Sequence, residues 1–313
     1  MTRWTTWLFG LLLLSGVCVV ALHFTEFEHW VELLRAAQPG WLALAVVLQL
    51  ATYVCVAHVW RCALVAVGTP QPYRSLLALA VAKLYSDQAL PSGGVSGSAF
   101  TVAALARRGV DSAGAFAALI VATLGYYVGY LASAALALWL LWRAHDLEPW
   151  MIATATVFVI VAVAIPAGLL WLRRRGRNAR LTRYLPARFE ALVDGLARVP
   201  ERVVRDRTLL SHAIGASALV FVLDAATLWS TLRAVGVDPT ITTVWPSFVL
   251  ASMVTTLGPI PMGLGTFEAV AVATLVALGT PVQAALAGTL LLRGLCVWLP
   301  MVPGLYLARR ALR

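Results

Sequence analysis

The sequence is poor in charged residues and contains almost no lysine. Charged side chains make up 12% of the 313 residues and apolar residues make up 61%, whereas ordinary soluble domains contain about 25% charged residues. Lys83 is the only lysine, so nearly all of the positive charge comes from arginine. Too few polar side chains are present to solvate a globule of this length, which excludes a soluble globular protein and indicates a membrane protein.

The sequence also lacks the motifs of common catalytic and nucleotide-binding sites. It contains no G-x4-G-K-[ST] loop, no H-E-x-x-H, no G-x-S-x-G and no C-x-x-C pair. Cys18, Cys55, Cys62 and Cys296 lie in or at the ends of apolar segments without ligand spacing, so they predict packing rather than disulfides or metal binding. We therefore expect no enzyme activity, no cofactor and no metal. Transport, if it is the function, would be driven by a gradient or would dissipate one.

Six apolar runs reach or approach the roughly 20 residues needed to cross a bilayer as a helix. They are Trp7–Leu22, Trp41–Val59, Ala113–Trp142, Trp150–Leu172, Leu209–Leu232 and Val282–Ala308. The first run could be a secretory signal, but it is long and no clear small-x-small site follows it, which favours an uncleaved span.

Two further apolar stretches, residues 75–107 and 244–279, are interrupted by similar Pro/Gly sequences. The predicted turn residues are Pro91, Gly93 and Gly94 in the first stretch and Pro261, Gly263 and Gly265 in the second, with 170 residues between the two prolines (261 − 91). A limb of about 15 residues is about 22 Å long as a helix, which is shorter than the roughly 30 Å hydrocarbon core. Each stretch is therefore one broken span or a hairpin that enters and leaves the membrane on the same side.

The distribution of arginine favours hairpins. With a cytoplasmic amino terminus, the hairpin alternative places Arg107 and Arg108, the 173–207 loop and the arginines at the carboxyl terminus on the cytoplasmic side. Three full spans separate the hairpins, so the second hairpin would enter from outside. The spacing predicts an inverted-topology repeat, over about 41–142 and about 209–308, whose two breaks face each other near the midplane.

The expected fold is therefore an all-α polytopic membrane protein with six full transmembrane helices and two re-entrant helical hairpins. We expect one domain over residues 1–313, with both termini in the cytoplasm.

The net charge of +10 is concentrated in one hydrophilic stretch. Eleven of the arginines lie between Arg173 and Arg207. A basic loop between spans indicates a cytoplasmic position and contact with anionic inner-leaflet lipids, and we expect no nucleic acid partner. Five residues on one helical face predict a helix lying on the membrane surface: Phe189, Leu192, Val193, Leu196 and Val199. A regulatory or partner-binding loop is the alternative.

Five ionisable residues are expected at depth in the membrane, where such groups are candidates for function: Lys83, Asp87, Asp224, Glu268 and Arg293. Lys83 and Asp87 share a helix face. They form a structural ion pair, or else Lys83 acts with Arg293 to bind an anionic head group. Glu268 follows the second break, where it can pair with Arg293 or simply cap a half-helix. Asp224 needs a partner, for which Arg293 or Lys83 is the natural choice.

The residues around the breaks resemble a known family. Residues 88–94 (QALPSGG) and 259–268 (PIPMGLGTFE), together with Arg107, Arg108, Gly109 and Arg293, are similar to the transmembrane region of lysylphosphatidylglycerol synthases. This region is the flippase-like domain of the multiple peptide resistance factor family, also found as stand-alone membrane proteins. The resemblance spans nearly the whole chain, and Met262 departs from it by replacing a glycine.

The resemblance implies a flippase that moves aminoacylated phosphatidylglycerol between leaflets of the bacterial plasma membrane, while a separate soluble domain carries aminoacyl transfer. Because the chain ends at Arg313, shortly after the last span, we expect no synthase domain and no lysylation. We predict translocation of an anionic or aminoacylated lipid, or of another amphiphile, whose head group passes the midplane charges while its tails stay in lipid.

A non-transporting accessory or scaffold subunit of a lipid or cell-envelope biosynthetic enzyme, docked through the 173–207 loop, is the alternative. An integral membrane transferase is a weaker one. A transporter needs a hydrated cavity joining the deep charges, whereas a scaffold can keep them in dry packing. Expected partners are lipids with an anionic head group and a lipid-modifying enzyme, with a homodimer as an option.

Overall fold

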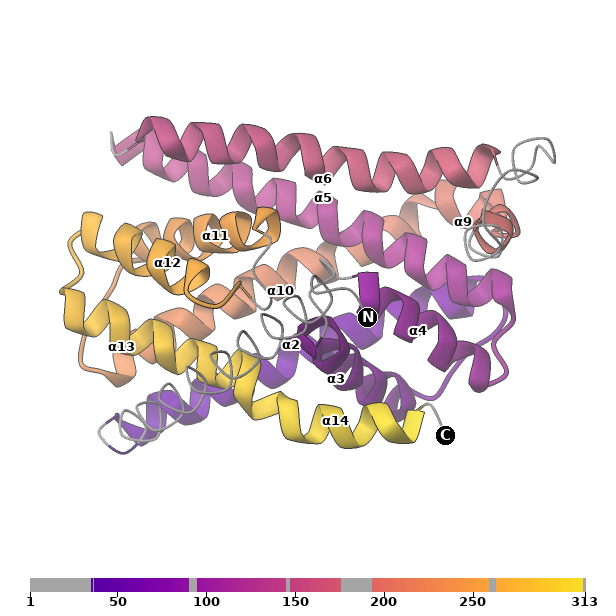
Figure 1. The fold of residues 1–313 in the computed structure, drawn as a ribbon, viewed down its shortest axis with the longest axis horizontal. Coiled ribbons are helices and arrows are strands. Elements are labelled where there is room, and N and C mark those ends of the chain that lie inside the picture. The colour runs from indigo at the N-terminus through magenta and orange to yellow at the C-terminus, as the bar shows by residue number, and fades with distance from the viewer. Residues whose placement is uncertain are drawn as a thin grey trace, which may run out of the picture.

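The computed structural model describes residue 35 and residues 37–89, 95–144, 147–175, 193–258 and 263–311, and over these residues the chain is helical without strands. The helices are α2 (Pro39–Ala66), α3 (Tyr73–Ala89), α4 (Val95–Arg107), α5 (Ser112–Ala144), α6 (Pro149–Arg175), α9 (Glu201–Arg205), α10 (Arg207–Ala234), α11 (Ile241–Leu257), α12 (Thr266–Ala277), α13 (Val282–Arg293), the π-helix η2 (Gly294–Trp298) and α14 (Leu299–Ala311) (Figure 1).

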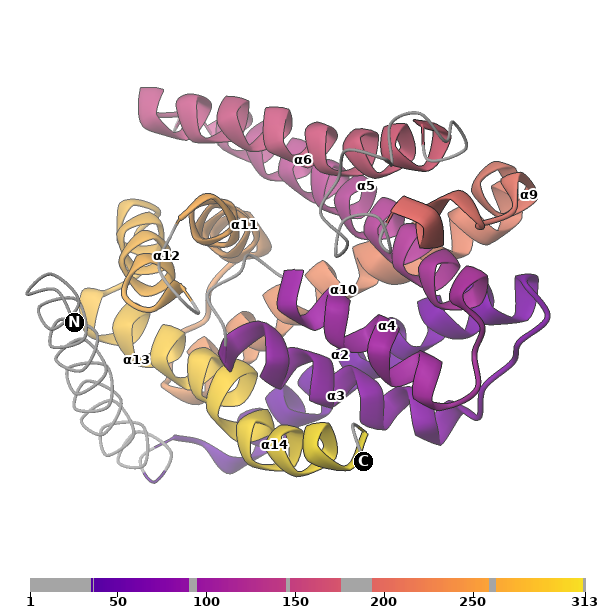
Figure 2. The ribbon, with the colours of Figure 1, turned by 45° about the vertical axis from the view of Figure 1, so that its right-hand side comes forward.

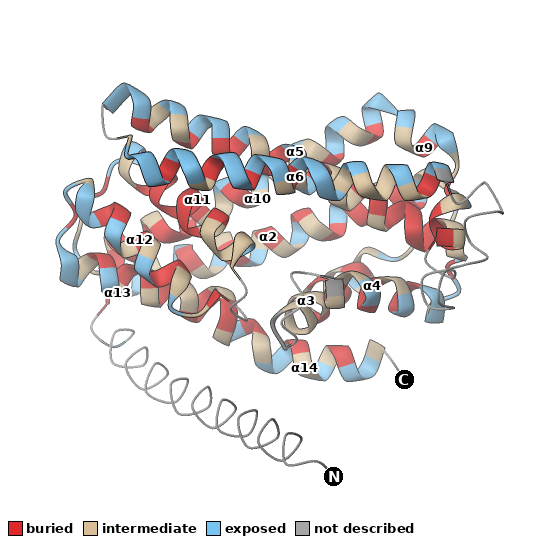
Figure 3. Ribbon diagram, turned by 45° about the horizontal axis from the view of Figure 1, so that its top comes forward, coloured by how far each residue is buried: buried red, intermediate tan, exposed pale blue. Residues whose placement is uncertain are grey.

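Within the described residues, five helices are long and apolar enough to cross a membrane. They are Pro39–Ala66, Ser112–Ala144, Pro149–Arg174, Arg207–Ala234 and the continuous run Val282–Ala311. They coincide with five of the six expected spans, and the sixth, Trp7–Leu22, lies outside the described residues. Helix α6 is exposed along much of its length (Figure 3). Its exposed residues include the apolar Ile152, Ile160 and Val163, as expected for a helix that faces lipid. The chain is therefore a multi-pass membrane protein.

Four of the helices end with the same glycine cap. Gly68, Gly109, Gly236 and Gly279 have φ values of 83°, 77°, 89° and 91°, a conformation that only glycine adopts without strain. In each cap the glycine N–H donates to the carbonyl three residues before it, and the next N–H donates to the carbonyl five residues before itself. The caps fall in two matching pairs, 168 residues apart (236 − 68) and 170 residues apart (279 − 109).

The helices around these caps also form two sets that match in order and length. Helices α2, α3, α4 and α5 contain 28, 17, 13 and 33 residues. Helices α10, α11 and α12 and the run α13–α14 contain 28, 17, 12 and 30. Contacts between the two sets match as well. Helix α3 of the first set packs on α14 of the second, and its counterpart α11 packs on α5 of the first. The first helices of the two sets, α2 and α10, pack on each other at the centre.

The two central helices are antiparallel. The start of α2 meets the end of α10, where the Gln38 N–H donates to the Ala234 carbonyl over 2.9 Å and Ser230 Oγ donates to the Trp41 carbonyl over 2.7 Å. The pair α3–α4 extends into the molecule from one end of its long axis and the pair α11–α12 from the other, so that both pairs stop near the middle (Figures 1 and 2).

The apolar side chains in the described part of the basic stretch pack into the protein. Val193, Leu196 and Val199 are all buried, the last two in a hydrophobic cluster with Phe116 of α5. The prediction of a helix on the membrane surface is wrong for these three residues, because protein rather than lipid covers their apolar face. The other two residues of that predicted face lie outside the described residues.

Arg173, at the start of the basic stretch, is also turned inward. The residue is 4% exposed, and its Nε and Nη2 donate to the Val199 carbonyl over 3.3 and 3.1 Å. Arg173 therefore holds the end of α6 to the segment before α9. This overturns the expectation that this particular arginine is available to lipid head groups.

Candidate functional site

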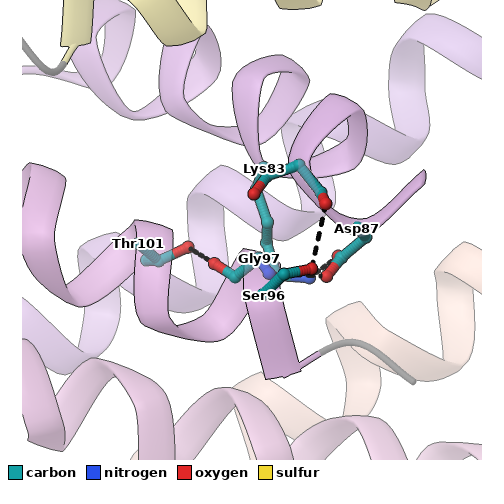
Figure 4. Close-up of polar contacts among 6 residues, drawn as sticks. Lys83, Asp87, Ser96, Gly97 and Thr101 are labelled. Carbon is teal, nitrogen blue, oxygen red and sulfur yellow. Dashed lines mark hydrogen bonds and ion pairs between the residues drawn. The ribbon is translucent and has the colours of Figure 1, made fainter. Parts of the chain in front are cut away.

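The first ion pair in the middle of the molecule lies within α3, and its carboxylate also binds the start of α4. Lys83 forms an ion pair with Asp87 Oδ2 one turn further along α3. Asp87 Oδ1 accepts a hydrogen bond of 2.9 Å from the backbone N–H of Gly97, in the first turn of α4 (Figure 4). The carboxylate thus satisfies a backbone donor that the helix itself leaves unpaired, while its negative charge lies near the positive end of the α4 dipole.

This contact depends on glycine at position 97. A Cβ atom placed there would lie 2.2 Å from Asp87 Oδ1, far inside van der Waals contact. Two further hydrogen bonds lie close by: Ser96 Oγ donates to the Ser86 carbonyl over 2.9 Å and Thr101 Oγ1 to the Gly97 carbonyl over 2.7 Å. The close approach of α3 and α4 therefore has a specific steric requirement.

The second ion pair joins α12 to α13. Arg293 Nε donates to Glu268 Oε1 over 2.6 Å, and the two side chains are only 13% and 11% exposed. The guanidinium also lies over the ring of Phe267, with 5.3 Å between Cζ and the ring centroid. Glu268 Oε2 is buried without a hydrogen-bond partner among the described residues. The helix changes to the π-helix η2 directly after Arg293, and such bulges are frequent at functional sites.

Asp224 on α10 belongs to neither ion pair within the described part of the chain. Its carboxyl lies beside the Gln49 side chain of α2, and its Oδ1 is buried without a hydrogen-bond partner there. The predicted pairing with Arg293 or Lys83 is therefore wrong. Each cation has a carboxylate closer to it in the fold: Asp87 lies one turn from Lys83, and Glu268 faces Arg293 across the α12–α13 contact.

Two neutral side chains connect Asp224 with the ion pairs. Tyr126 of α5 lies within electrostatic reach of both Asp224 and Asp87. Cys296 of η2 lies within reach of both Asp224 and Arg293, and its Sγ donates to Gln49 Oε1 over 3.1 Å. The five predicted residues therefore surround one region, with Asp224 between the two ion pairs.

Three residues of this region, Gln49, Tyr126 and Cys296, were not predicted as site residues. Tyr126 contacts the rings of Tyr127 and Phe221, with centroids 5.3 and 5.4 Å apart, so it also packs as expected of an aromatic residue in a span. Of these three residues, Gln49 could have been noticed in the sequence, because it is an amide within an otherwise apolar run. The cysteine and the tyrosine carried no such signal, since both residue types are common in helix packing.

Of the six predicted turn residues, the structure describes Gly263 and Gly265. Their φ values are 62° and 76°, which accounts for glycine at both positions. A Cβ atom at Gly263 would lie 2.1 Å from Thr255 Cγ2 of α11, so the chain passes close to the end of that helix. Pro91, Gly93, Gly94 and Pro261 lie outside the described residues.

The described residues contain no group of three or more His, Cys, Asp or Glu side chains that could hold a metal ion. Among these residues the polar centre consists of two ion pairs, the carboxyl group of Asp224 beside the Gln49 amide, and neutral hydrogen-bonding groups.

The fold and these charges define a polytopic helical membrane protein with a polar centre between two matching sets of helices. A comparison with family models matches residues 7–304 to the lysylphosphatidylglycerol synthase TM region, and the chain belongs to that family. Among curated proteins, no sequence matched the chain.

Proposed function

We propose that the protein is a flippase that moves an anionic or aminoacylated lipid, or a related amphiphile, between the leaflets of a bacterial plasma membrane. In this proposal the long axis of the molecule lies along the membrane normal. The pairs α3–α4 and α11–α12 are then re-entrant hairpins of two inverted repeats, and residues 7–22 add a sixth span. Both termini lie in the cytoplasm, and no catalytic step is assigned to the protein.

One observation carries the proposal: two short helix pairs extend into the molecule from opposite ends, and each contributes to an ion pair, Lys83–Asp87 on α3 and Glu268 of α12 with Arg293 of α13. Charges at this depth in a membrane are expensive and are generally kept for a function. Lys83 and Arg293 are the cations that an anionic head group can approach. Arginine suits phosphate because its guanidinium can donate two parallel hydrogen bonds.

The arrangement allows exchange of one anion for another. A phosphate at Arg293 would replace Glu268 as the partner of the guanidinium, so the number of charge pairs would stay the same. Helices α4 and α12 both begin in this region, and the positive ends of their dipoles favour negative charge there. Each cation thus has a carboxylate partner that holds it until a head group arrives.

An apolar pocket supports a substrate with hydrocarbon tails. A pocket of about 270 Å³ lies between α10 and α11, lined by Val222, Ala226, Trp229, Ile241 and Trp245. None of these side chains is charged, as suits an acyl chain. A lipid could therefore keep its tail among apolar side chains while its head group crosses the polar centre.

The exposed arginines of the basic stretch complete the proposal. Arg198, Arg202, Arg205 and Arg207 are all exposed, and in a cytoplasmic position they would attract anionic lipids of the inner leaflet. The same surface could receive a lipid-modifying enzyme that supplies the substrate.

The test is lipid translocation in proteoliposomes, with a fluorescent head-group label quenched from outside. Labelled phosphatidylglycerol and aminoacyl-phosphatidylglycerol are compared with labelled phosphatidylcholine. Wild type should expose the first two faster than empty liposomes do, and Arg293→Ala and Glu268→Gln should abolish the gain. Glu148→Gln and Arg310→Ala, which alter exposed charges outside the basic stretch, serve as matched controls and should behave as wild type.

Equal rates in protein-containing and empty liposomes would refute transport. Unchanged rates in both site variants would refute the role of this ion pair. A scaffold subunit would give the first result while still co-purifying with a lipid-modifying enzyme.

A further inference from the structure

Asp224 differs from the two other carboxyl groups at the polar centre because no cation among the described residues pairs with it. Asp87 has Lys83 and Glu268 has Arg293, whereas the described residues around Asp224 offer the neutral amide of Gln49. Its Oδ1 is buried and accepts no hydrogen bond from those residues. The Gln49 amide offsets part of the desolvation of this carboxyl group. A desolvated carboxyl group without a nearby cation favours its neutral form, which makes Asp224 a candidate for proton binding.

Among the residues that the structure describes, the groups that face Asp224 are neutral on the helices packed against α10. The titratable ones are Tyr53 and Cys55 on α2, Tyr126 on α5 and Cys296 on η2. Helix α11 contains no titratable residue, and the charged residue of α13 is Arg293, engaged with Glu268. Helix α9 packs at the start of α10, about 25 Å along the helix from Asp224.

Asp224 lies near both ion pairs. Cys296, three residues after Arg293, donates to Gln49 Oε1 over 3.1 Å, and Gln49 lies beside Asp224. Tyr126 lies near both Asp224 and Asp87, and its ring packs on Phe221 of α10. A head group that displaces Asp87 or Glu268 would therefore change the electrostatic field at Asp224. By thermodynamic reciprocity, the protonation state of Asp224 would change the affinity for the head group.

We propose that Asp224 is a proton-binding site that couples lipid translocation to the movement of one proton across the membrane. The inference rests on the proposed flippase function. In each cycle one O–H bond forms when the carboxyl takes a proton from water on one side, and one breaks when the proton returns to water on the other. The other deep carboxylates keep their cations in the empty state, so they do not compete for this proton.

The experiment uses the full-length protein in proteoliposomes with labelled phosphatidylglycerol, an imposed pH gradient and the membrane potential held at zero. With one proton per lipid, a gradient of one pH unit should sustain an about tenfold difference in labelled lipid between leaflets. Reversing the gradient should reverse the difference. Asp224→Asn should remove the difference, Asp224→Glu should retain it, and Glu148→Gln is the matched control at an exposed carboxyl.

Three results would overturn the coupling: translocation by wild type with no asymmetry under a pH gradient, equal asymmetry in Asp224→Asn, or an asymmetry that follows a sodium gradient instead. If wild type moves no lipid, the proposed flippase function fails, and a separate measurement still decides whether Asp224 carries a proton. Infrared difference spectra should then show the C=O band of a protonated carboxyl that is lost in Asp224→Asn. Absence of that band would overturn the proton site itself. The same spectra also test the proton site if Asp224→Asn moves no lipid at all, because they do not depend on transport.

Discussion

Replacing only one partner of the Glu268–Arg293 ion pair should destabilise the protein far more than replacing both. The two side chains are 11% and 13% exposed, so little water reaches the pair. Arg293→Met leaves Glu268 as an uncompensated buried charge, which should lower the free energy of unfolding by about 3 kcal/mol, at the lower end of the range for buried pairs. Glu268→Gln should have a similar effect because it leaves the guanidinium without its carboxylate.

The double variant separates stability from function. With Glu268→Gln and Arg293→Met combined, no unpaired charge remains, and the stability should return to within about 1 kcal/mol of wild type. Translocation should remain absent, because the cation proposed to meet the head group is gone. A loss of function without a loss of stability is the signature of a binding role.

The assay is thermal stability of the purified protein in one detergent, measured as the fraction that stays monodisperse after heating. The Glu201–Arg205 ion pair is a matched control of the same residue types with a 2.8 Å contact, but its side chains are 48% and 77% exposed. The same substitutions there should change stability by less than about 0.5 kcal/mol. A double variant at Glu268 and Arg293 as unstable as Arg293→Met alone would refute the argument, and so would single variants as stable as wild type.

Two further predictions concern glycine positions and use the same heating assay. Gly97→Ala should destabilise the protein by about 1–3 kcal/mol, because a methyl group at this position clashes with Asp87 Oδ1 and displaces the hydrogen bond that joins α3 to α4. A stability equal to that of wild type would mean that the two helices separate at no cost. Gly279→Ala and Gly168→Ala should have opposite effects on stability. Gly279→Ala places a side chain at a φ of +91° and should destabilise the protein by about 1–2 kcal/mol. Gly168 lies within α6 with open space around it, so Gly168→Ala should stabilise the protein by about 0.5–1 kcal/mol. Effects of the same sign would contradict the conformational explanation.

Much of the helical framework was predictable because it depends on local properties of the chain. A run of about 20 apolar residues forms a helix in a bilayer whatever its neighbours are, since the backbone has no other hydrogen-bond partners there. Five of the expected spans accordingly coincide with helices. The ion pair of Lys83 and Asp87 was also foreseeable, because residues four apart share a helix face.

The choice of partner for Asp224 was not predictable in the same way. The sequence indicates that a carboxyl lies within a span, but it does not reveal which side chains on other helices approach it. The apolar face at Val193, Leu196 and Val199 shows the same limit. Helical periodicity identified an apolar face, yet it could not distinguish a face covered by protein from one covered by lipid.

The sequence by itself determined that the chain is a helical membrane protein, where its long spans lie, and which ionisable residues fall within apolar segments, because these properties follow from composition and spacing. Only the tertiary structure decided that Glu268 pairs with Arg293, that Arg173 turns into the protein, and that Asp224 stands between two ion pairs without a cation among the described residues. Those outcomes depend on how helices far apart in the chain pack together, and packing sets the distances on which electrostatic interactions depend.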